Sequence, residues 1–182
     1  MNADLQKLEQ QIEAENITIL LMPKINYSDR LMDIFKLFSE HRQKICYVSA
    51  NRPAKSLMKQ FEAFSIDANK FKIIDCISDS VTQTDKRNAS VYFIGSPKNL
   101  TELSIVLAKS MQEGAENIFV DALSTFVIYQ DSITVVRFTH NLISKLRSDE
   151  KNGIFVVLKD EISNVLLSDL SMFVDNVIDG EN

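Results

Sequence analysis

The chain has few of the residues that interrupt regular structure. Only four glycines and three prolines occur among its 182 residues, and no glycine precedes Gly95. Because both residues concentrate in turns and loops, their scarcity indicates that helices and strands fill most of the chain. With 45% hydrophobic and 25% charged residues, the composition predicts a folded globular domain and excludes a disordered chain.

Cysteines and long apolar runs are also scarce. Cys46 and Cys76 lie in apolar segments without metal-ligand spacing, so we expect two buried free thiols. No apolar run approaches the about 20 residues that a membrane-spanning helix needs. The first residues are charged and lack the apolar core of a signal peptide. These absences favour a cytoplasmic protein with no membrane partner.

The charge balance is acidic, with a net charge of −5. A chain of this charge repels phosphate backbones and anionic lipid surfaces over most of its surface. The composition therefore argues against nucleic acid as a general partner.

Strand-like and helix-like segments alternate from residue 16 onward, and residues 1–15 form a mostly polar helical arm. The alternation predicts a three-layer α/β domain over 16–182, with a mostly parallel sheet and helices on both faces. We expect the arm to add little to the core, and we expect the polar loop 78–90 to be mobile. The strands are expected at 16–22, 44–50, 70–77, 91–95, 116–123, 154–160 and 172–178. Helices are expected from about 28, from Pro53, and over 96–114, 131–152 and 162–171.

Acidic residues follow several of the expected strands. In an open parallel sheet, ligands bind beyond the carboxyl ends of the strands. Asp75, Asp121 and Asp160 all fall at such positions, so one hypothesis is that they converge on a cation.

Four segments together resemble the core of the RecA-type ATPases, and most closely the KaiC-like and archaeal Rad55-like branch. They are "YVSANRP" (47–53), "SPKNLTELS" (96–104), the stretch 117–158 and "LSMFVDNVI" (170–178). The resemblance covers roughly residues 16–179 and is most specific over 117–158. It implies a RecA-like fold with Asp121, at the end of "IFVD", as the Walker B carboxylate that orders magnesium.

The phosphate-binding loop of that family is degenerate here. The resemblance places it at residues 22–29, where the chain reads "MPKINYSD". Ser28 then occupies the place of the family lysine and Asp29 that of the following hydroxyl residue. A phosphate cradle needs glycines that turn backbone N–H groups inward and a lysine on the phosphates. Asp29 in a first helical turn would repel a phosphate.

The catalytic glutamate that the family carries after its second strand is also missing. Asn51 and Arg52 stand at that place, and neither can act as a general base at neutral pH. Asp121 is therefore the only candidate metal ligand. We expect it to be structural instead, accepting hydrogen bonds from backbone N–H groups of the following turn or from Ser124. Lys24 and Arg30 flank the degenerate loop and are interpreted as solvated surface charges.

The main hypothesis is a RecA/KaiC-like domain that is not an enzyme, needs no cofactor and serves as a regulatory or assembly partner of another protein. The resemblance suggests a second copy or an active RecA-like paralogue as the partner. A first alternative is a sensor that binds a nucleotide or small anion without hydrolysis at the vestigial site. That site consists of Lys24, Ser28, Asp29, Asn51, Arg52, Asp121 and Ser124. A second alternative, a DNA-repair accessory paralogue, is disfavoured by the acidic charge.

Overall fold

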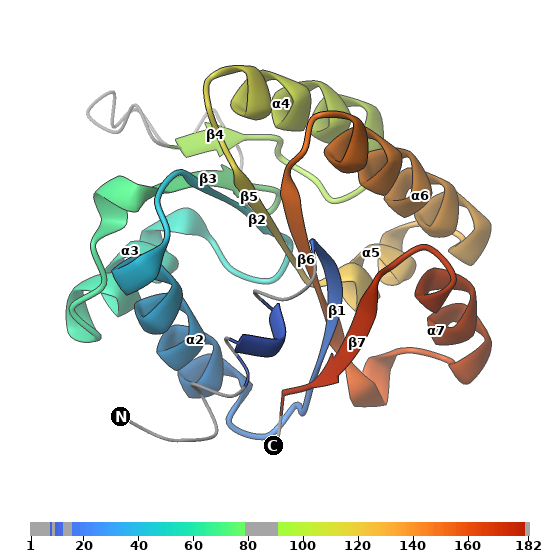
Figure 1. Ribbon diagram of the computed structural model, residues 1–182, viewed down its shortest axis with the longest axis horizontal. Helices are drawn as coiled ribbons and strands as arrows, with labels where there is room; N and C mark the ends of the chain where they lie inside the picture. The colour runs from blue at the N-terminus through green and yellow to red at the C-terminus, as the bar shows by residue number, and fades with distance from the viewer. Residues whose placement is uncertain (1–7, 9, 13–15, 79–90, 181–182) are drawn as a thin grey trace.

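The computed structural model describes residues 8, 10–12, 16–78 and 91–180. Seven parallel strands form one sheet in the order β4-β3-β2-β5-β6-β1-β7 (Figure 1). The strands are β1 Ile17–Met22, β2 Ile45–Ser49, β3 Phe71–Asp75, β4 Val91–Phe93, β5 Asn117–Asp121, β6 Asn152–Leu158 and β7 Asn176–Asp179. The central strands are buried on both faces, which explains why they read as continuous apolar runs.

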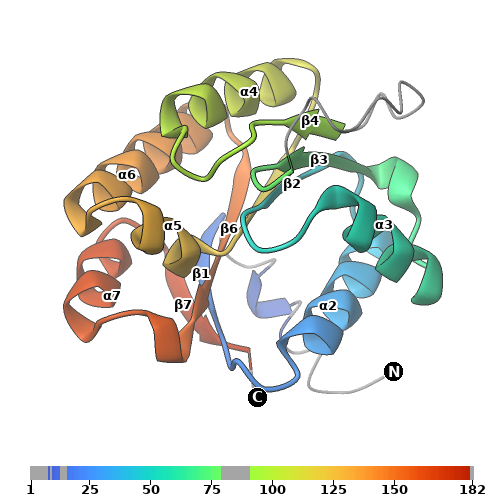
Figure 2. The same cartoon turned by 180° about the vertical axis from the view of Figure 1, so that it is seen from behind.

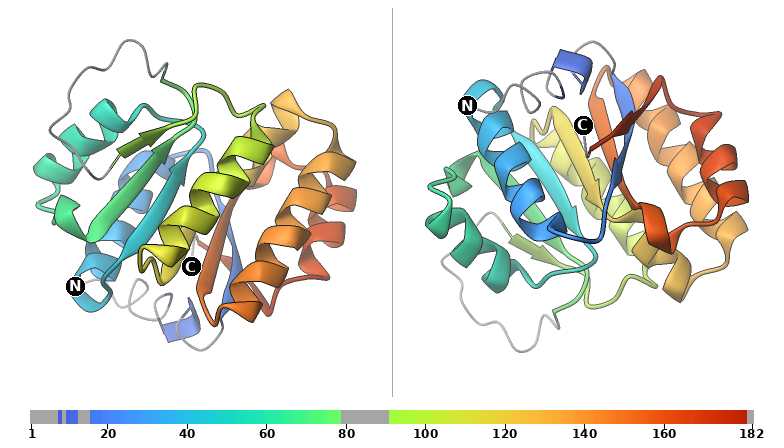
Figure 3. Two further views of the ribbon diagram at one scale, coloured as in Figure 1. Left: turned by 90° about the horizontal axis from the view of Figure 1, so that it is seen from above. Right: turned by 90° about the horizontal axis from the view of Figure 1, so that it is seen from below.

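Helices cover both faces of the sheet, as the alternating pattern predicts (Figures 2 and 3). One face packs against α2 Tyr27–His41 and α3 Ala54–Ala63. The other face packs against α4 Leu100–Gln112, α6 Ser132–Ser148 and α7 Asn164–Ser171. The described connections also contain the single-turn 3₁₀ helices η1 Ala68–Lys70 and η3 Lys159–Glu161. None of the helices in the described residues is long and apolar enough to cross a membrane.

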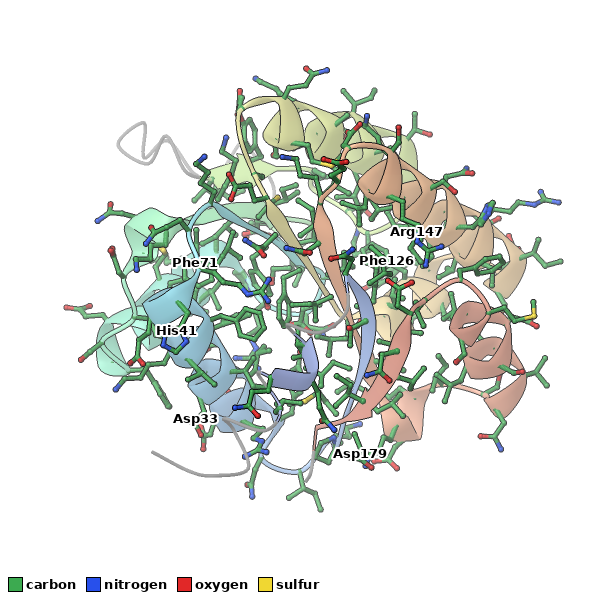
Figure 4. The ribbon with its side chains drawn as sticks, viewed as in Figure 1. Asp33, His41, Phe71, Phe126, Arg147 and Asp179 are labelled. Carbon is green, nitrogen blue, oxygen red and sulfur yellow. The ribbon has the colours of Figure 1, made fainter. Side chains whose placement is uncertain are left out.

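An aromatic cluster fills the core beneath α2 and α3. The ring of Phe35 lies 4.8 Å from Tyr47, 4.8 Å from Phe119 and 5.5 Å from Phe71 between centroids. The first two pairs meet edge to face, the arrangement that aromatic quadrupoles favour. Phe71, labelled in Figure 4, begins β3 and closes the cluster at the amino-terminal edge of the sheet.

One helix differs from the sequence-based expectation. Residues Leu123–Tyr129 form α5, where the sequence predicted only a turn after the strand. The segment is rich in β-branched and aromatic residues, which have modest helix propensity. It is helical because Leu123 and Phe126 are buried in the core. The expected loop 78–90 falls almost entirely outside the described residues.

The N-terminal arm contributes to the core, contrary to expectation. Residues 8 and 10–12 are helical. Leu8 and Ile12 are 1% and 2% exposed and belong to the same apolar cluster as α2 and α3. Two fully buried aliphatic side chains each stabilise a fold by about 1.5–3 kcal/mol. The described apolar residues of the arm are therefore part of the core.

Candidate functional site

The candidate site lies at the carboxyl edge of the sheet, where β1, β2 and β5 end. Asp121 is the last residue of β5 and is paired in register with Ser49, the last residue of β2. Only β6 separates β5 from β1. The turns that follow β1 and β2 therefore lie on either side of Asp121, and they carry the residues that the sequence placed in a vestigial nucleotide site.

The turn after β1 is short and leads directly into α2. Asn26 adopts a left-handed conformation, with φ of 57°, and its carbonyl accepts the first helical hydrogen bond from Arg30 N at 3.0 Å. Asparagine tolerates this conformation better than most other non-glycine residues. The turn thus reverses direction without a glycine. Tyr27, the first residue of α2, is consequently placed beside the end of β5.

Asp121 is fully buried and accepts a hydrogen bond on each carboxylate oxygen. The hydroxyl of Tyr27 donates to Oδ1, and the hydroxyl of Tyr47 on β2 donates to Oδ2. The sequence predicted backbone N–H groups of the following turn or Ser124 as the donors, and this prediction is wrong. Ser124 Oγ instead accepts from the backbone N–H of Leu158 at 3.3 Å.

Burial changes the titration of this cluster. It raises the pKa of Asp121 to about 8, because the charged form loses its hydration inside the protein. Burial also raises the pKa of Tyr47, so its phenol stays protonated and remains a donor. The raised pKa favours the protonated form, which is a poor ligand for a divalent cation.

A second network closes the site beside Tyr27. The guanidinium of Arg52 donates through Nη1 to Ser28 Oγ at 3.0 Å and to Gln60 Oε1 at 2.7 Å. Gln60 Nε2 also donates to Ser28 Oγ, at 2.9 Å. Arg52 lies over the ring of Tyr27, with its Cζ 5.2 Å from the ring centroid. The hydroxyl of Ser28 is thus held by two neighbouring side chains.

The remaining predicted site residues have other roles. Asn51 accepts a hydrogen bond from the hydroxyl of Thr125, which ties the turn after β2 to α5. Lys24 is exposed and pairs with Glu161 at 3.2 Å. Asp29 is exposed in the first turn of α2, where a carboxylate complements the helix dipole.

Arg30 was expected to be a solvated surface charge, and this expectation is wrong. Its side chain is half-buried, and its Nε donates to the carbonyl of Gly180 at 3.1 Å.

The three strand-end aspartates do not converge on a cation. Asp75 is buried and accepts from the backbone N–H groups of Ala54, Ile77 and Ser78 at 2.7–2.8 Å. Asp160 is exposed on η3. Among the described residues no group of three or more His, Cys, Asp or Glu side chains could hold a metal ion. Asp75 instead holds the start of α3 against the turn after β3.

Sequence reasoning missed three partners of this site: Tyr27, Tyr47 and Gln60. Tyr27 and Tyr47 lie 94 and 74 positions from Asp121 in the chain. No spacing rule connects residues so far apart. A partial signal was available for Tyr47. It lies two residues before the end of β2, and Asp121 ends β5 at the same edge of the sheet.

We predict that stability depends on pH through Asp121. The pKa of this carboxyl is 3.8 in a solvated chain and about 8 in the folded protein. Protonated Asp121 therefore makes its full contribution to the stability of the fold below about pH 4, and this contribution is lost as pH rises through about 8. Relative to Asp121→Asn, the natural protein should lose roughly 1 kcal/mol of unfolding free energy per pH unit in this window. Urea titrations at several pH values test this, and parallel profiles for both proteins would contradict it.

A comparison with solved structures supports the assignment of the fold. The structure is similar to that of the KaiC-like protein PH0186 from the archaeon Pyrococcus horikoshii OT3, with a TM-score of 0.64 and 11% sequence identity. The match covers 90% of this chain and 71% of PH0186, and it confirms the RecA/KaiC-like fold. A search of curated proteins gives no match. A family model described as a family of unknown function, DUF7090, matches residues 2–182, and the chain belongs to that family.

Proposed function

We propose that this protein is a RecA/KaiC-like domain without ATPase activity that acts as a regulatory or assembly partner of another protein. The observation that carries the proposal is the hydrogen bond from Tyr27 to Asp121. By resemblance, Asp121 stands where an active relative orders magnesium. In this protein a side chain from the degenerate loop occupies that carboxylate.

The surrounding contacts support the same conclusion. ATP hydrolysis needs a phosphate cradle, a cation on the phosphates, a magnesium site and a group that orients water. Ser28 replaces the cation and is held by Arg52 and Gln60. Asn51, in place of the glutamate, is held by Thr125. Because these groups bind one another, we favour a protein partner over the nucleotide or anion sensor.

Exposed apolar side chains favour an interaction with another protein. Ile128 and Ile133, at the corner between α5 and α6, are 72% and 64% exposed, and Tyr129 between them is 42% exposed. Single exposed apolar residues are common, but clusters on a folded surface often mark contacts with other proteins. This corner lies at the carboxyl edge of the sheet, as does Ile25, which is 79% exposed. The resemblance suggests a RecA-like chain as the partner.

We predict no release of phosphate from ATP or GTP above background in the presence of magnesium, with or without DNA. The glycines, the lysine and the glutamate that such catalysis requires are absent, and Asp121 holds two tyrosine hydroxyls. A colorimetric phosphate assay measures this. The matched control is Asp121→Asn, which keeps a side chain of the same size. Turnover in the natural protein that disappears in this variant would overturn the proposal.

We predict that tagged protein captures a stoichiometric RecA-like chain, either a paralogue or a second copy, from the lysate of its native cells. Quantitative mass spectrometry identifies a captured paralogue, and light scattering detects a second copy. The double variant Ile128→Glu, Ile133→Glu should lose this partner, because two buried carboxylates would have no counter-charge. Met172→Glu is the matched control, since Met172, which follows the last residue of α7, is 73% exposed. Equal capture by all three proteins, or no enriched chain, would contradict the prediction.

A further inference from the structure

A separate cavity lies at the amino-terminal edge of the sheet, opposite the site around Asp121. Its volume is about 150 Å³, and it is bounded by the first residues of β2 and β3 and by the turn that follows α4. On the scale of liquid water this volume holds about five molecules. Three of the residues that line it are lysines, Lys44, Lys70 and Lys72, and one is an acid, Glu113.

Two glutamates partly neutralise the lysines of this cavity. Lys44 pairs with Glu116 at 2.8 Å. Glu113 is shared, because Lys72 pairs with one of its carboxylate oxygens and Lys109 approaches the other at 3.8 Å. The Lys72 side chain is only 25% exposed, so its charge is better shielded from solvent than that of a typical surface lysine.

Lys70 carries a charge that no carboxylate of the described residues balances. Its half-buried ammonium group donates to the carbonyl of Ser39, near the end of α2. Four lysines and two glutamates therefore leave two positive charges around the cavity. This local surplus occurs in a chain whose net charge is −5, so it is a local departure from the average surface.

The charge and the surroundings of this cavity decide whether an anion can bind there. The carbonyl end of α4 faces the cavity through the turn at Gly114 and contributes about half a negative charge. The two surplus positive charges exceed this contribution. Phe71 also lines the cavity, and its 2%-exposed side chain packs in the core, with its ring 4.6 Å from that of Phe61 between centroids. The Lys72 side chain is 25% exposed, so its ammonium group interacts more strongly with an anion than it would in open solvent.

We propose that this cavity is a binding site for a small multivalent oxyanion, with Lys44, Lys70 and Lys72 as its ligands. Lysine ammonium groups bind phosphate as compact point charges with three donors each. A bound oxyanion would connect the start of β2, the start of β3 and the turn after α4. The site shares no residue with the Asp121 site, so it stands or falls independently of the proposed function.

The test is the melting temperature of the full chain in magnesium-free buffer as sodium pyrophosphate is added at constant ionic strength. An anion that binds only the folded state raises the melting temperature in a saturable way. Lys72→Gln should need at least about tenfold more pyrophosphate for the same rise. Lys59→Gln, an exposed lysine on α3, is the matched control with the same charge change and should behave like the natural protein.

A parallel titration with citrate separates phosphate chemistry from carboxylate chemistry. A rise with pyrophosphate alone supports a phosphate site, and a rise with both anions supports a general oxyanion site. Amide chemical shifts then locate the anion, with the largest changes expected at residues 44–45, 70–72 and 113–115. No rise with pyrophosphate, an equal rise in all three proteins, or shifts centred on Arg52 would overturn the proposal.

Discussion

The carboxylate of Asp121 must be satisfied inside the protein, and the surrounding structure is arranged to do this. An unpaired buried carboxylate costs many kcal/mol, so it either finds donors or takes up a proton. Here two phenols donate to it, and burial also raises its pKa to about 8, which favours the protonated form. The Tyr27 bond in turn fixes the first residue of α2 and the turn that leads into it.

The site and the core are continuous through Tyr47. Its hydroxyl donates to Asp121, and its ring packs 4.8 Å from Phe35 at the centre of the aromatic cluster. On the solvent side, Arg52 covers the ring of Tyr27 and links α2 to α3 through Ser28 and Gln60. A ligand that reached Asp121 would have to break these contacts together. We therefore interpret the site as a packed extension of the core.

The sequence predicted the sheet well because parallel strands buried on both faces are continuous apolar runs. The resemblance also placed Asp121 correctly at the end of β5, whereas the apolar pattern alone extended this strand to residue 123. The errors in the sequence-based prediction have a common physical origin. The donors to Asp121, the helicity of α5 and the burial of Leu8 all depend on residues that are distant in the chain. Local propensity and periodicity carry no information about such contacts.

Magnesium binding at Asp121 provides the most direct test of the central claim that tyrosine hydroxyls hold this carboxylate. The measurement compares melting temperatures in millimolar magnesium and in chelator, both without any phosphate compound, for the natural protein and for Asp121→Asn. Because a ligand specific to the folded state raises its stability, a working metal site would show a magnesium-dependent shift. We expect no shift in either protein. A shift in the natural protein that is lost in Asp121→Asn would contradict the account.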